Sequence, residues 1–189
     1  AIQNIQIPFG WSGISSFVNP TDPNPEIIFE EIIDELNIVN NEYGLYWPAE
    51  NINTLNWNSH DGYTIKVSDT VGFIVIGSLD HNPHLLLDEN WNLIPVISSC
   101  AINVETVFNQ TECIIVKEVA GTRIFWPEFE INTLQALEPG KAYYVLMNEN
   151  TVIIFPECNG EKSEGSRHKE ENILNGYNIS PTAVSHSVA

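Results

Sequence analysis

The residues of this chain that could do chemistry are five histidines, three cysteines and an excess of carboxylates. His81 and His84, written H-N-P-H, could bring two imidazoles to one metal ion, but the sequence offers no convincing third ligand. Any two of the 25 acidic residues could be proposed as the acid and base of a glycoside hydrolase, so their number carries no information. The segment GWSGIS lacks the order of a nucleophile elbow. The sequence therefore favours a protein that is not an enzyme and needs no cofactor.

The cysteines, Cys100, Cys113 and Cys158, show no C-x-x-C spacing, which argues against zinc and thioredoxin-type redox chemistry. Cys100 precedes and Cys113 follows a short predicted helix at 104–110. A disulfide between these two residues would close that excursion in an oxidising compartment. Three unpaired thiols are the alternative.

A third kind of chemistry is sugar recognition, which uses aromatic rings flanked by hydrogen-bonding groups. Trp57 stands in the polar stretch Asn56–Asp61 and could stack on a sugar. The alternative is that its indole fills a hydrophobic core. The candidate contacts for a glycan or other surface ligand are Trp57, Asn58, His60, Asp61, Tyr43 and Tyr46.

The sequence segments that must position these residues occur twice in the chain. YWPAENINTL at 46–55 returns as FWPEFEINTL at 125–134, and Trp126 follows Trp47 by 79 positions. Other matched pairs lie 77 to 80 positions apart, which indicates an internal duplication. The tryptophans and phenylalanines that recur are predicted to be buried core anchors: Trp11, Trp47, Trp91, Trp126, Phe29 and Phe108.

The duplication divides the chain into a first module at 1–80, a second module at 81–159, and a polar linker with the start of a following strand or domain at 160–189. Alternating apolar residues and short β-branched runs predict mainly strands. Each module should hold one short helix, near 25–36 and 103–110. We expect a β-rich α+β protein of two tandem, pseudo-symmetric modules resembling small barrels or sandwiches. The apolar strand at 143–147 predicts that the modules pack together.

The formal charge is −18, from 7 basic and 25 acidic residues, and would repel nucleic acid. No apolar run reaches the 18 residues expected of a membrane-spanning helix, so membrane insertion is not expected. The acidity and the many asparagines suit a solvated extracellular surface. They leave room for calcium, although EF-hand spacing is absent.

The order Gly-Trp-x-x-Ile, Trp-Pro, Ile-Asn-Thr-Leu and Gly-Tyr-x-x-Lys-Val resembles the paired repeats of large secreted and cell-surface proteins of Bacteroidetes. The resemblance covers most of residues 5–156. It implies export and neighbouring domains of the same polypeptide as partners, and it carries over no catalytic residues. The second copy departs from the pattern, with Ala142 in place of Gly62 and Leu137 in place of Trp57.

Two functions follow as expectations. The first is a non-catalytic, extracellular structural and adhesion-associated module, favoured because the shared residues are mostly those that a core needs. The alternative is a module that binds carbohydrate or another surface ligand.

Overall fold

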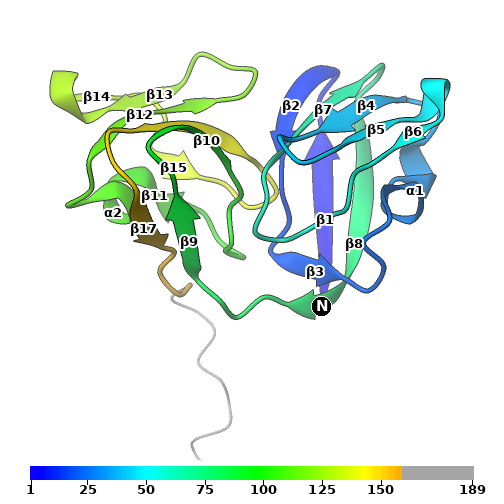
Figure 1. Cartoon of the computed structure of the whole chain (residues 1–189), viewed down its shortest axis with the longest axis horizontal. Helices are drawn as coiled ribbons and strands as arrows, with labels where there is room; N and C mark the ends of the chain where they lie inside the picture. The colour runs from blue at the N-terminus through cyan, green and yellow to red at the C-terminus, as the bar shows by residue number, and fades with distance from the viewer. Residues whose placement is uncertain (159–189) are drawn as a thin grey trace, which may run out of the picture. The chain divides into compact units, whose positions relative to one another are not determined.

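Strands dominate the computed structural model, which describes residues 1–158 (Figure 1). The prediction of a mainly β protein is confirmed. The linker and strand predicted at 160–189, together with His168 and His186, lie outside the described residues. Within 1–158, no helix is long and apolar enough to cross a membrane.

The first half, residues 1–80, contains a five-stranded antiparallel sheet and a three-stranded sheet. The larger sheet has the order β2-β7-β4-β5-β6, with β2 Gly10–Ile14, β4 Leu36–Asn40, β5 Leu45–Trp47, β6 Ile52–Asn53 and β7 Tyr63–Val67. The smaller has the order β1-β8-β3, with β1 Ile2–Ile7, β3 Val18–Pro20 and β8 Val71–Leu79. The short helices are α1 Pro25–Ile28, η1 Glu30–Ile32 and η2 Pro48–Glu50. The two sheets enclose a core between them.

The second half, residues 81–158, contains a five-stranded sheet of order β10-β16-β12-β13-β14 and two pairs, β17-β9 and β11-β15. Its strands are β9 His84–Leu87, β10 Asn90–Ile94, β11 Ile102–Asn103, β12 Cys113–Glu118, β13 Ile124–Trp126, β14 Ile131–Asn132, β15 Ala136–Leu137, β16 Tyr143–Met147 and β17 Thr151–Ile154. The short helices are α2 Val104–Phe108 and η3 Pro127–Phe129. The two five-stranded sheets pair their strands in the same way. The last strand in chain order, β7 or β16, lies between the first, β2 or β10, and the second, β4 or β12. None of the sheets in residues 1–158 closes into a barrel, so the barrel form of the prediction is wrong.

Asparagine caps begin both α-helices. The side chain of Asn24 accepts a hydrogen bond from the Glu26 N–H, and Pro25 occupies the first turn, where its missing N–H costs nothing. Asn103 caps α2 in the same way, through the Glu105 N–H. The first helix is shorter than the predicted 25–36. Isoleucines have restricted rotamers in helices, and Leu36 begins β4 instead, where it pairs with Val67 of β7.

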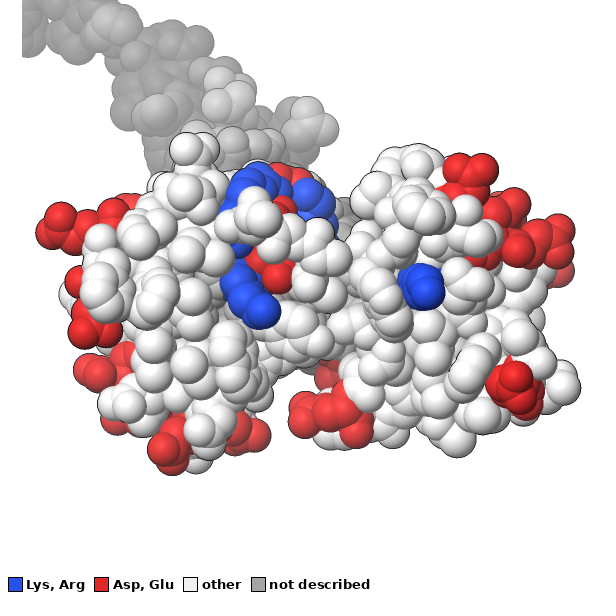
Figure 2. All heavy atoms as spheres, turned by 90° about the horizontal axis from the view of Figure 1, so that it is seen from above, with Lys and Arg blue, Asp and Glu red and all other residues white. Residues whose placement is uncertain are grey.

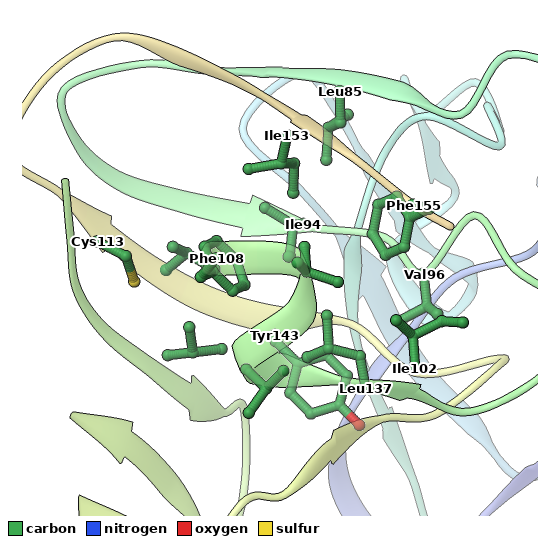
Figure 3. Packing of buried hydrophobic residues seen from close by; sticks show 14 of the residues in the cluster. Leu85, Ile94, Val96, Ile102, Phe108, Cys113, Leu137, Tyr143, Ile153 and Phe155 are labelled. Carbon is green, nitrogen blue, oxygen red and sulfur yellow. The ribbon is translucent and has the colours of Figure 1, made fainter. Parts of the chain in front are cut away.

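Buried hydrophobic residues form two separate clusters, one from each half. Phe29, fully buried, lies in the first and contacts the rings of Phe73 and Trp57. Phe108 of α2 lies in the second, and Figure 3 labels it among the side chains of that cluster. Each half therefore has a hydrophobic core of its own.

The halves are nevertheless joined by backbone contacts around Ser15, which is fully buried. Its N–H donates to the Gly140 carbonyl at 3.1 Å, and its hydroxyl donates to the Lys141 carbonyl at 2.6 Å. The same hydroxyl accepts the Val96 N–H at 3.0 Å. Ile14 and Lys141 form an antiparallel bridge beside them. One side chain from the first half therefore satisfies polar groups of two segments of the second.

The disulfide joins Cys100 to Cys158, and Cys113 is free and buried. The predicted pair of Cys100 with Cys113 is wrong, as is the alternative of three thiols. Cys113 is the first residue of β12, and its side chain points into the core (Figure 3). Burial raises the pKa of the Cys113 thiol to about 12, so it remains protonated at neutral pH. A disulfide of this kind is typical of oxidising compartments.

Thiol labelling should reproduce this pairing. The oxidised protein, unfolded in denaturant, is expected to react with one maleimide per chain, at Cys113, and with three after reduction. Peptide mapping without reduction should recover the peptides of Cys100 and Cys158 linked together. A linked peptide containing Cys113 would contradict the assignment.

Candidate functional site

Trp57 does not form an exposed platform, because it is 2% exposed in the first core. Its ring stacks on Tyr63 with centroids 4.2 Å apart, and its Nε1 donates to the Ser16 hydroxyl at 2.8 Å. Tyr46 is also buried, at 5% exposed. The prediction that these two rings contact a ligand is wrong, since an indole with a buried hydrogen-bond partner fills the core well.

The four tryptophans that were predicted to be buried in the cores are instead exposed or partly exposed. Trp11, Trp47 and Trp91 are 46%, 39% and 53% exposed, and Trp126 is partly exposed. The prediction that all four are buried is wrong. Each lies on a strand whose alternate residues point into the core, so its own ring points to the outer face of a five-stranded sheet. Phe29 and Phe108 do lie in the cores.

The outer faces of the two five-stranded sheets carry aromatic rings and few carboxylates. The Lys66 ammonium lies 5.9 Å from the Trp11 ring, and that of Lys117 lies 5.7 Å from Trp91 and 5.6 Å from Tyr144. Figure 2 views the molecule from the side where both five-stranded sheets lie in Figure 1. It shows Lys and Arg within this face and Asp and Glu mostly at its margins. An acidic protein thus has one side with little negative charge.

A groove of about 370 Å³ lies between the halves, and we call it the inter-half groove. Three of the predicted ligand contacts line it, namely Tyr43, His60 and Asp61. Asn58 does not line it; its side chain accepts the His60 N–H within a turn. Residues of both halves form its walls, including Glu42, Tyr43 and Asp61 from the first and Asp88, Trp91 and Tyr144 from the second. The groove therefore exists only where the two halves meet.

The inter-half groove is acidic. Burial, reinforced by the neighbouring Glu42 carboxylate, raises the pKa of Asp61, while His60 lowers it. Hydrogen bonding to Glu42, with burial and the charges of Asp61 and Asp88 added, raises the pKa of Tyr43 to about 12. Three carboxylates therefore influence one phenol, and no lysine or arginine is among the lining residues.

Ser59 and Asp80 lie beside the groove residue His60, but the three are not arranged as a nucleophile relay. Such a relay needs the serine hydroxyl to donate to the imidazole. Here the Ser59 hydroxyl donates to Asp80 Oδ2 at 2.6 Å, and His60 Nδ1 lies 2.8 Å from the same oxygen. His60 Nε2 is buried without a partner. The arrangement anchors the loop that forms the groove wall.

Metal ligation gains no positive support from the geometry. In the part of the chain that the structure describes, no group of three or more His, Cys, Asp or Glu side chains is placed to hold a metal ion. His81 and His84, considered as a metal pair, are both exposed.

Sequence reasoning missed Trp91 as a groove residue, although one signal could have found it. Tyr144 and Leu146 occupy alternate positions facing outward on β16, and Trp91 pairs with Leu146 across the sheet. An apolar outward face on one strand predicts that its neighbours on that face are aromatic or apolar too.

No protein-family model, no curated protein and no solved structure matches this chain.

Proposed function

We propose that the chain is a non-catalytic, structural and adhesion-associated module of a larger secreted or cell-surface protein. Its two halves act as one rigid unit that sets the spacing and direction of neighbouring domains. The observation that carries this proposal is the buried Ser15 hydroxyl, which bonds both Lys141 and Val96 across the junction. Because polar groups buried at a junction are costly to separate, such contacts resist bending between the halves.

We also propose that the halves are related by duplication and by an approximate two-fold arrangement. A Cβ on Gly62 would lie 2.8 Å from the Leu93 carbonyl oxygen, and a Cβ on Gly13 would collide with the Ala142 carbonyl. Gly13 matches Leu93, and Gly62 matches Ala142, at the same offset of 80 positions. Reciprocal contacts of this kind are what a two-fold relation produces. Close backbone approach explains the small residues at these positions.

The extracellular part of the proposal draws on two supports. The Cys100–Cys158 disulfide fits an oxidising compartment, and the repeated motifs resemble those of exported Bacteroidetes proteins. Neighbouring domains of the same polypeptide are the proposed partners. Neither nucleic acid nor a membrane is proposed as one, and no cofactor is proposed.

Distance measurements across the junction test the rigid unit. Nitroxides attached through an unnatural ketone amino acid at Ile76 and Val152, both more than half exposed, would report the separation of the halves. We expect one narrow distance distribution, unchanged between low and high salt because the junction is built from buried hydrogen bonds. A broad distribution would contradict the proposal, because halves on a flexible tether sample many separations.

A further inference from the structure

We propose that the inter-half groove binds a neutral oligosaccharide, with the rings of Trp91 and Tyr43 as stacking surfaces. This inference goes beyond the structural role, and it rests on the packing of the two halves, because residues of both form the groove. It also moves the predicted sugar site from Trp57, which is buried, to a surface formed by both halves.

The first support is the exposure of large rings on opposite walls. Trp91, from the second half, is 53% exposed, and Tyr43, from the first, is 73% exposed. Tyr144 braces the indole edge to face, with centroids 6.3 Å apart. A sugar ring offers an apolar C–H face to such rings, and its burial there removes apolar surface from water. Two exposed rings facing one groove can therefore hold sugar units.

The second support is the set of polar groups between those rings. The carboxylates of Glu42, Asp61 and Asp88 are acceptors that sugar hydroxyls can donate to, and charged acceptors form stronger hydrogen bonds than neutral ones. None of the three takes part in an ion pair among the described residues. Asn40 adds the amino group of its side-chain amide to the same walls, whereas the Asn92 amide is already bonded to backbone groups of Asp88 and Asn90. A few convergent polar groups beside rings are typical of small-ligand sites.

Charge decides which class of ligand fits. Three carboxylates without a lysine or arginine in the lining disfavour an anionic ligand. A cationic ligand would seek the ring faces, but the Lys117 ammonium already lies 5.7 Å from the Trp91 ring and 5.6 Å from the Tyr144 ring. A second cation there would meet like-charge repulsion. A neutral ligand rich in hydroxyl groups avoids both penalties.

A second, smaller cavity lies elsewhere in the same chain. It has about 130 Å³ and includes Trp11, Glu118 and Lys141 in its lining. There the Glu118 carboxylate is paired with Arg123 at 2.6 Å, so its oxygens are already committed. Trp11 occupies the sequence position that matches Trp91 and is similarly exposed, at 46%. It therefore provides a matched control outside the inter-half groove.

Affinity electrophoresis of the full chain tests the proposal. The gels would contain neutral polysaccharides (xyloglucan, glucomannan, mixed-linkage β-glucan or galactomannan), anionic polygalacturonate, or cationic chitosan. We expect at least one neutral polysaccharide to retard the protein. Trp91→Ala and Tyr43→Ala should each weaken that binding about tenfold or more, the loss expected of an aromatic anchor, while Trp11→Ala should change it less than about twofold.

Three outcomes would overturn the proposal. They are no retardation by any neutral polysaccharide, retardation only by chitosan or only by polygalacturonate, and equal loss of binding in Trp11→Ala and Trp91→Ala. Circular dichroism of each variant should match the parent, because all three replaced rings are exposed. The distance measurement across the junction uses no glycan, so absent retardation together with a narrow distance distribution would overturn the glycan proposal and leave the structural proposal standing.

Discussion

The Ser15→Ala variant should unfold with a free energy about 2 to 4 kcal/mol lower than that of the parent chain. Removing the hydroxyl leaves the Val96 N–H and the Lys141 carbonyl buried without their partner. Each unsatisfied group costs about 1 to 3 kcal/mol, and local rearrangement recovers part of this. Chemical denaturation followed by circular dichroism measures the change.

The neighbouring Ser16→Ala variant is the matched control. Ser16 is equally buried, but its hydroxyl accepts from Trp57 and donates to Val18, both within the first half. Both variants should be less stable than the parent chain, yet only Ser15→Ala should speed amide hydrogen exchange at Val96 in the second half. Unchanged exchange at Val96 in Ser15→Ala would show that the junction does not depend on this hydroxyl.

The Trp57→Leu variant should lose about 3 kcal/mol of stability, even though leucine stands at the matching position 137. The smaller side chain leaves a cavity beside Phe29 and Tyr63 and removes the donor that satisfies Ser16. Trp11→Leu, which replaces an exposed ring, should change stability by less than about 0.5 kcal/mol. Similar losses in both variants would contradict the assignment of Trp57 to the core.

Spacing in the sequence predicted the placement of elements better than the direction of side chains. The short helices begin at the asparagine caps, and the matched Trp-Pro segments each lead into a one-turn 3-10 helix, at Pro48–Glu50 and Pro127–Phe129. These features depend on local chemistry, because proline favours the first turn of a helix and asparagine caps it. Local chemistry is visible in a single sequence.

The tryptophans were assigned to the wrong environment because recurrence does not distinguish a core from a surface. On β10, Trp91 and Ile94 are both apolar, and only the pairing of Ile94 with the buried Tyr143 reveals which faces inward. A shift of one residue in register would exchange the two faces. The sequence alone does not fix that register, and the exposed rings of the candidate groove therefore escaped prediction.

The disulfide and the groove both depend on contacts distant in sequence. Cys158 lies 58 residues from Cys100. The sequence-based prediction considered only cysteines that flank one short helix, so it could not identify this pair. The groove joins Tyr43 and Asp61 to Trp91, which belong to different halves. Three of the six predicted ligand contacts line it, but their partners across the junction could be identified only from the structure.

The central claim is that the two halves, each with its own core, are packed together tightly enough to unfold in one cooperative step. Differential scanning calorimetry of the oxidised full chain tests this claim most directly. The account predicts a single transition whose calorimetric and van't Hoff enthalpies agree. It also predicts that Ser15→Ala broadens this transition or splits it. Two resolved transitions in the parent chain, one for each core, would contradict the claim.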